Sequence, residues 1–209
     1  TSSPTREAPE PTARADVYYV GQLYPWKGVD TLIRAAALNP HIRHMIVGGA
    51  EEPDAEDRDI ARLAALAQSL GITESVTFTG WVPYHRVPSI LRDAAVTVIP
   101  LPDTPFGRYF TSPLKLFDYM AAATPIVASD LPSLRDVLQH ESNALLVNPE
   151  DPQAFALAIR RLIENPELAQ RLGLQAHQDV EQYSWDSRAA RLLDRSEEHT
   201  SELQSRGLI

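Results

Sequence analysis

The sequence predicts an α/β fold, a doubly wound, Rossmann-like parallel sheet of about six strands with helices on both faces. Short apolar segments alternate along the chain with longer segments whose apolar residues recur at helical spacing. Strands that are short, apolar and separated by helices are typical of parallel sheets covered on both faces. Glycines follow several of these segments and favour sharp turns at the strand ends.

The expected strands and helices follow one another in strict order. The strands are expected at 17–20, 43–47, 76–79, 95–99, 126–128 and 144–147. The helices are expected at about 28–38, 57–70, 88–93, 112–124, 133–138, 152–164 and 166–182. The clearest is 57–70, which carries Ile60, Leu63 and Ala67 at helical spacing before a capping Gly71. A proline-rich loop is expected at 100–111.

The turn residues should line one edge of the sheet. In doubly wound sheets, ligands bind outside the carboxyl ends of the strands. Gly21, Gly48-Gly49, Gly80 and the loop 100–111 all follow strands, and the helix after that loop begins at the same edge. We therefore expect the functional site there.

Composition narrows the class of protein. The chain has 209 residues, 44% of them hydrophobic and 22% charged, which suits a globular domain. A net charge of −9 argues against a nucleic-acid partner, which needs a basic face. The absence of cysteine excludes disulfides and thiol chemistry. No apolar run approaches the length of a membrane span, and no signal peptide is recognisable, so a cytoplasmic location is the expectation.

The segment 111–130 carries the most specific pattern. Ser112 is suited to cap a helix and Pro113 to open it, while Thr124-Pro125 should end it before a buried strand. Lys115 lies near the helix start and Asp118 about one turn later. Free N–H groups, the helix dipole and a lysine attract an anion, and a carboxylate accepts hydrogen bonds from hydroxyls. This combination suits an anionic ligand that carries a sugar.

That segment resembles the donor-site pattern of GT-B glycosyltransferases of the large retaining group, which reads Ser-Pro-x-Lys-x-Phe-Glu-Tyr-Met-Ala. A second segment, 20–30, resembles the Gly-Arg-Leu…Lys-Gly segment whose Arg and Lys neutralise the donor diphosphate in that family. The resemblance covers residues 16–194 and implies the C-terminal, donor-binding domain. It implies transfer of a sugar from a nucleoside-diphosphate sugar to an acceptor hydroxyl, in glycan, polysaccharide or glycolipid synthesis.

The resemblance also implies the residues of the site. Lys27 and Lys115 would stabilise the departing diphosphate, and Asp118 would hold the ribose hydroxyls. The remaining donor-binding residues would be Gly21, Gln22, Gly80, Ser112 and Leu114. No metal or other cofactor is expected, since the lysines and the helix dipole supply the counter-charge. Asp57-x-Asp59 fits a metal motif but is expected to favour the start of a helix instead.

The sequence departs from the family pattern at three positions. This chain has Gln22 where the family has Arg and Asp118 where the family has Glu. It has Phe110 at the position of the first of two family glutamates. Arg108 and Tyr109 are either contacts to the sugar or phosphate or exposed loop residues. Two other functions therefore stay open: a sugar-nucleotide 2-epimerase of the same fold, and a non-catalytic nucleotide-binding module.

The ends of the chain are expected to lie outside the domain. Residues 1–15 are rich in proline and small polar residues, as in a linker. Residues 195–205 match a translation of the adapter used in short-read DNA libraries, so 195–209 is interpreted as an artefact. The resemblance implies that an N-terminal acceptor domain is missing, and peripheral membrane association would occur through that domain.

Overall fold

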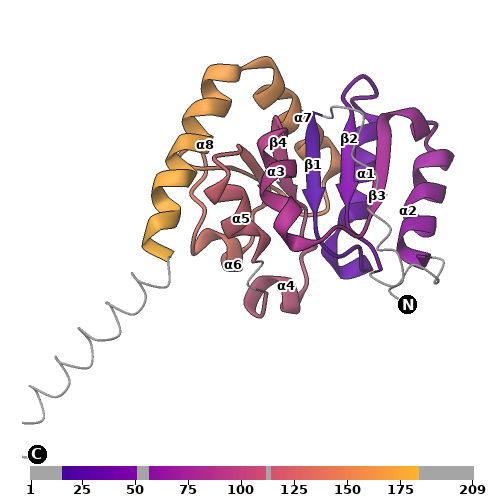
Figure 1. The fold of residues 1–209 in the computed structure, drawn as a ribbon, viewed down its shortest axis with the longest axis horizontal. Helices are drawn as coiled ribbons and strands as arrows, with labels where there is room; N and C mark the ends of the chain where they lie inside the picture. The colour runs from indigo at the N-terminus through magenta and orange to yellow at the C-terminus, as the bar shows by residue number, and fades with distance from the viewer. Residues whose placement is uncertain (1–15, 51–56, 112–113, 184–209) are drawn as a thin grey trace, which may run out of the picture.

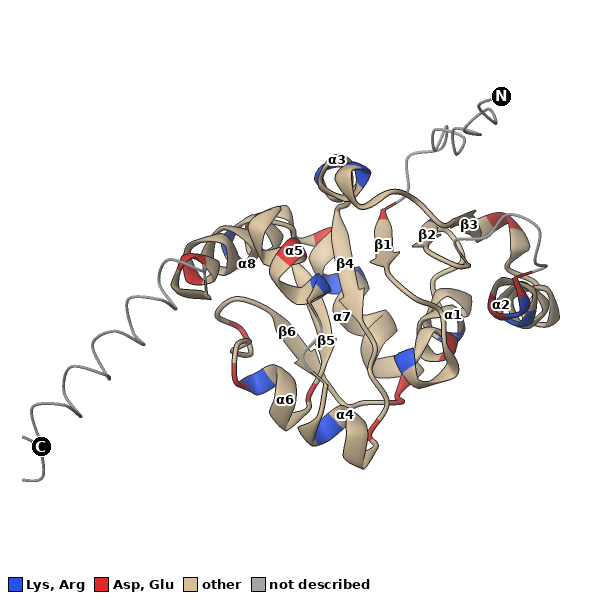
Figure 2. Cartoon of the chain, turned by 60° about the horizontal axis from the view of Figure 1, so that its bottom comes forward, with Lys and Arg blue, Asp and Glu red and all other residues tan. Residues whose placement is uncertain are grey.

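The computed structural model describes residues 16–50, 57–111 and 114–183. The described part forms a six-stranded parallel sheet with the order β3-β2-β1-β4-β5-β6, so the expected doubly wound fold is confirmed. The strands are β1 (Val17–Val20), β2 (His44–Val47), β3 (Val76–Gly80), β4 (Val96–Ile99), β5 (Ile126–Ser129) and β6 (Leu145–Val147). They carry no charged residue and appear tan throughout in Figure 2.

The helices follow the strands in the expected order (Figure 1). The α-helices are α1 (Val29–Ala37), α2 (Arg58–Ser69), α3 (Val87–Arg92), α4 (Pro105–Tyr109), α5 (Lys115–Ala121), α6 (Pro132–Arg135), α7 (Pro152–Glu164) and α8 (Pro166–Val180). The 3-10 helices are η1 (Pro25–Lys27), η2 (Thr73–Ser75), η3 (Tyr84–Arg86) and η4 (Glu181–Tyr183). Within the described residues, no helix has both the length and the apolar character needed to cross a bilayer.

The sheet separates two apolar clusters. Val17 and Tyr19 of β1 pack into the cluster that contains residues of α1, α2 and α7. Tyr18 and Val20 pack on the opposite face, with residues of α3, α5 and α6. Alternate residues of a strand point to opposite faces, so this one short strand contributes to both halves of the core. The helix α8 reaches both clusters, through Leu172 and Ala176.

Two details of the expected elements are wrong. The helix expected from Ser112 begins at Lys115, and Leu114 occupies its capping position without a side-chain cap. Ser112 and Pro113 lie outside the described residues. The expected loop 100–111 contains α4, which Thr104 caps by accepting a hydrogen bond from the Gly107 N–H. Proline at its first position suits a helix start, a signal that the loop interpretation overlooked.

The strands β1 and β4 diverge at the carboxyl edge of the sheet. They pair only through Val17 with Val96 and Tyr18 with Thr97. The strand order reverses direction between these two strands, and in doubly wound sheets this switch point opens the crevice that binds ligands. Figure 1 shows β1 and β2 pointing toward the end of the molecule that carries α4.

Candidate donor-binding site

The chain contains only two lysines, Lys27 and Lys115, and the fold brings them to the same place. Lys27 ends η1, which follows β1, and Lys115 is the first residue of α5, which follows β4. The two lysines are therefore carried by the two strands that separate at the switch point. They are close enough that the charge of Lys27 lowers the pKa of Lys115.

Lys115 is held against the end of β1. Its Nζ atom lies 3.7 Å from the centroid of the Tyr19 ring, a cation–π contact. A Cβ atom built on Gly21 would lie 2.6 Å from the same Nζ, so a side chain at residue 21 would displace the amine from this position. Gly21 also has a φ of 141°, which few other residues adopt. Gly21 is therefore a point of close approach, and the group that approaches it in this structure is a lysine.

Tyr119 fixes α5 against β1. Its hydroxyl accepts a 2.8 Å hydrogen bond from the Val20 N–H and lies 3.3 Å from the Val20 carbonyl oxygen. These are backbone groups that β4 leaves unpaired once it diverges from β1. The ring is fully buried. Sequence analysis missed this role, although a phenol at a buried helical position is itself a signal, because buried hydroxyls need partners.

Lys27 is placed by the glycine that follows it. Gly28 has a φ of 73°, and its N–H donates to the Pro25 carbonyl to close η1. A Cβ atom at Gly28 would lie 1.7 Å from the Pro100 carbonyl oxygen. The loop that carries Lys27 therefore packs directly on the backbone that leaves β4, which no side chain would allow.

Neither lysine has an acidic partner among the described residues. The ion pairs found there use arginine or histidine as the cation. Burial and the neighbouring Lys27 charge, in that order, hold the pKa of Lys115 well below its ordinary value. Two neighbouring lysines that lack an acidic partner among the described residues form a site that an anion would stabilise.

The low pKa of Lys115 can be measured directly because the chain has so few amines. Reductive methylation with ¹³C-formaldehyde should give two lysine signals in an NMR titration, and Lys27→Arg assigns them while keeping the charge. We expect the Lys115 signal to titrate well below an ordinary lysine. Lys27→Ala should raise that pKa, because a like charge is removed. Two lysines that both titrate at the ordinary value would contradict this environment.

Asp118 lies in the first turn of α5, three residues after Lys115. Its Oδ1 accepts a 2.7 Å hydrogen bond from the hydroxyl of Tyr84 in η3. The carboxylate raises the pKa of Tyr84, first through this hydrogen bond and then through its charge. The carboxylate is therefore close to Lys115 along the chain but is hydrogen-bonded to the segment that follows β3.

The other expected site residues lie around the same edge. Gly80 ends β3 with a φ of 74°, faces open space, and its carbonyl accepts a hydrogen bond from the Gly48 N–H. Gln22 is exposed, and its carbonyl accepts a 2.6 Å hydrogen bond from the Tyr19 hydroxyl. Leu114 is 76% exposed and immediately precedes α5. Ser112 lies outside the described residues.

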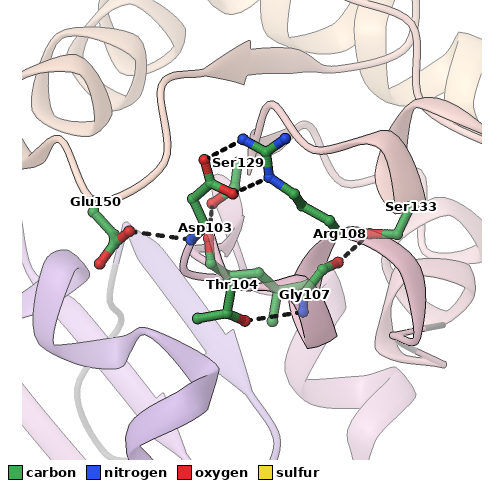
Figure 3. Close-up of polar contacts among 8 residues, drawn as sticks. Asp103, Thr104, Gly107, Arg108, Ser129, Ser133 and Glu150 are labelled. Atoms are coloured by element: carbon green, nitrogen blue, oxygen red, sulfur yellow. Dashed lines mark hydrogen bonds and ion pairs between the residues drawn. The ribbon is translucent and has the colours of Figure 1, made fainter.

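The loop after β4 is tied down by polar contacts (Figure 3). The Asp103 N–H donates to Glu150, and the Ser133 hydroxyl donates to the Gly107 carbonyl at 2.6 Å. Arg108 forms a two-point ion pair with Asp103, and this lowers the pKa of the Asp103 carboxyl. The charge of Arg108 is therefore already compensated within the loop. This favours its interpretation as an exposed loop residue over that of a contact to the sugar or phosphate.

Asp57 acts as a helix cap. Its Oδ1 accepts hydrogen bonds of 3.0 Å from the N–H groups of Asp59 and Ile60 at the start of α2. This agrees with its interpretation as a helix-start residue. Across the part of the chain that the structure describes, no three metal-ligating side chains converge.

Two cavities flank this edge of the sheet. One of about 390 Å³ is lined by Arg108, Tyr109, Phe110, Thr111, Pro132, Ser133, Asp136 and Val137. The other, of about 360 Å³, is lined by Gln22, Leu23, Tyr24, Gly49, Ala50, Asp57, Asp59 and Trp81. Neither is lined by the lysines or Asp118. The chemistry of the charged groups, rather than the size of a cavity, identifies the site.

Comparison with known proteins agrees with this geometry. Residues 5–179 match the family model described as glycosyl transferases group 1. The chain belongs to this family. The expectation of a GT-B glycosyltransferase fold is confirmed with it, because solved members share the arrangement of strands and helices.

Among curated relatives, the D-inositol 3-phosphate glycosyltransferase of Acidothermus cellulolyticus is 34% identical over 179 residues, which are 82% of this chain and 38% of the relative. Sucrose-phosphate synthase from Thermosynechococcus elongatus superposes with a TM-score of 0.76 and 28% identity, over 92% of this chain and 47% of that one. HepE of Anabaena, solved in complex with UDP, gives a TM-score of 0.73 at 21% identity, over 87% and 49% of the two chains. This group 1 chain spans about two fifths of the length of the curated relatives that it matches.

Proposed function

We propose that this group 1 chain is the donor-binding part of a glycosyltransferase that uses a nucleoside-diphosphate sugar. One observation carries the proposal: the only two lysines of a chain with net charge −9 flank the switch point of the sheet, and the described residues offer them no carboxylate. A diphosphate supplies the missing negative charge. Asp118, one helical turn from Lys115, would accept hydrogen bonds from the ribose hydroxyls.

The chemistry required of the site is charge stabilisation. When the bond between the sugar and the diphosphate breaks, negative charge grows on the leaving phosphate, and fixed positive groups lower the energy of that transition state. Lys27 and Lys115 would provide this charge. Their role needs no proton exchange and no metal ion. Gly21, Gln22, Gly80, Ser112 and Leu114 would complete the donor site. Retention of configuration follows the group that the sequence resembles.

The acceptor would be bound by a further, N-terminal domain of the protein, and any attachment to a membrane would occur through that domain. That domain would determine which acceptor hydroxyl receives the sugar. It would therefore also determine whether the enzyme acts in glycan, polysaccharide or glycolipid synthesis. Because half of the cleft would be missing, the 209-residue chain should bind nucleotide weakly and transfer little or no sugar.

Calorimetric titration with UDP and GDP tests this function. We expect weak binding that is lost at high salt, because screening weakens contacts between ammonium and phosphate groups at an open edge. The chain should also release no free sugar product and epimerise no donor. Robust transfer by this chain alone would contradict the proposal of a missing acceptor domain. Epimerisation of a donor without any acceptor would replace transfer by the epimerase function.

A further inference from the structure

The segment after β3 reaches across to the carboxylate of α5. Pro83 precedes η3 with extended backbone angles, and Tyr84 is the first residue of η3. The Tyr84 hydroxyl donates to Asp118 Oδ1 at 2.7 Å, and this bond joins residues 34 positions apart in the chain. It connects the end of β3 to the first turn of α5 at the edge of the sheet where the lysines meet.

Packing does not explain the position of the Tyr84 side chain. The residue is 70% exposed, among the most exposed of the large hydrophobic residues, so little of its ring area is removed from water. Its hydroxyl is held by the hydrogen bond to Asp118. The raised pKa of Tyr84 keeps the phenol protonated across the neutral range, so the hydroxyl remains a donor. A specific hydrogen bond on an exposed ring indicates a role at the site rather than in the core.

One hydrogen bond is enough to orient an aspartate. The side chain has two torsions, so fixing one oxygen fixes the direction of the other. A carboxylate offers about four acceptor positions over its two oxygens, and Tyr84 occupies one of them. The remaining positions can accept both hydroxyls of a ribose. Holding them in place before binding reduces the conformational entropy lost on association.

We propose that Tyr84 is a positioning residue of the donor site, which orients the Asp118 carboxylate to accept the 2′- and 3′-hydroxyls of the nucleotide ribose. This inference rests on the proposed function, because it assumes that a nucleotide diphosphate occupies the lysine pair. It adds a selectivity that the lysines cannot provide. They recognise phosphate, whereas the Tyr84–Asp118 pair distinguishes a ribonucleotide from a deoxyribonucleotide.

The test compares three ligands: UDP, 2′-deoxy-UDP and inorganic pyrophosphate. Equilibrium binding is measured for the full chain and for the variants Tyr84→Phe, Asp118→Ala and the double variant. Ser89→Ala is the matched control, because Ser89 lies five residues from Tyr84 and its exposed hydroxyl also makes one 2.7 Å hydrogen bond, to the Arg86 carbonyl. Circular dichroism and thermal unfolding check that each variant is folded.

Tyr84→Phe should weaken UDP binding by about three- to tenfold, the effect of one lost hydrogen bond. Binding of pyrophosphate should change by less than about twofold, which a merely structural role would not produce. Binding of 2′-deoxy-UDP, which keeps only the 3′-hydroxyl, should be weakened less than that of UDP. In the Asp118→Ala background, Tyr84→Phe should have no further effect, because the two residues act through one carboxylate. Ser89→Ala should bind all three ligands like the original chain.

Several results would overturn the inference. Unchanged UDP binding in Tyr84→Phe would do so, as would equal losses for UDP and pyrophosphate, or additive effects in the double variant. Tighter UDP binding in Tyr84→Phe would also overturn it, by showing that the phenol competes with the ribose. Lys115→Ala separates this outcome from failure of the proposed function. If Lys115→Ala weakens pyrophosphate binding while Tyr84→Phe leaves UDP binding unchanged, only the positioning role of Tyr84 is overturned. If UDP and pyrophosphate do not bind, or bind without dependence on Lys115, both proposals fall.

Discussion

Lys115→Ala is expected to weaken the binding of UDP or GDP by about 1–3 kcal/mol, or roughly 5- to 150-fold, the range for a lost charged hydrogen bond. The lysine is half-buried against Tyr19 and Gly21, so solvent screens its contact with a phosphate less than at an exposed position. Isothermal titration at low and moderate salt measures the effect. Lys27→Ala should weaken binding within the same range. It also raises the pKa of Lys115, so the two changes should not be additive.

Arg34→Ala provides the control for these lysine variants. Arg34 is exposed in the last turn of α1. Lys27 lies just before the other end of that helix. Its removal changes the net charge by the same amount as either lysine variant but should leave nucleotide affinity unchanged. If Lys27→Ala and Lys115→Ala both bind as tightly as the original chain, the assignment of the diphosphate site is wrong. If Arg34→Ala weakens binding equally, the lysines act only through net charge.

Gly28→Ala should destabilise the fold by roughly 3–5 kcal/mol, among the largest effects expected of one substitution. The positive φ of 73° already disfavours alanine, and the added Cβ would meet the Pro100 carbonyl oxygen at 1.7 Å. The segments that leave β1 and β4 would have to separate, which moves Lys27 away from Lys115. Denaturant unfolding should therefore show a large loss of stability, and the variant should lose nucleotide affinity under conditions in which it is still folded.

Gly71→Ala separates backbone strain from this contact. Gly71 has a φ of 69°, close to that of Gly28, but nothing lies within 4 Å of a Cβ built there. The loss of stability should be about 1–2 kcal/mol, the cost of a left-handed alanine alone. Nucleotide affinity should not change, because Gly71 lies after α2 and far along the chain from either lysine. Equal losses for the two variants would show that close packing on Pro100 adds nothing.

The secondary structure could be read from the sequence because its signals are local. Apolar periodicity placed α2 and α7 within a residue of their observed ends, and glycine turns placed the ends of β1 and β3. The start of α5 and the short helix α4 were missed. In both places, proline and polar residues are compatible with a loop and with a helix start, so the local sequence does not distinguish the two.

The sequence by itself determined the order of strands and helices, the family, and the edge of the sheet where the motifs lie, because each depends on residues adjacent in the chain. Only the tertiary structure decided that β1 lies beside β4, and that the two lysines flank this point without a carboxylate among the described residues. It also decided that Tyr119 and Tyr84 hold α5 in place. Contacts between residues tens of positions apart depend on strand order and side-chain packing. Local periodicity specifies neither strand order nor side-chain packing. The charge environment of the site is therefore established only when the sheet is assembled.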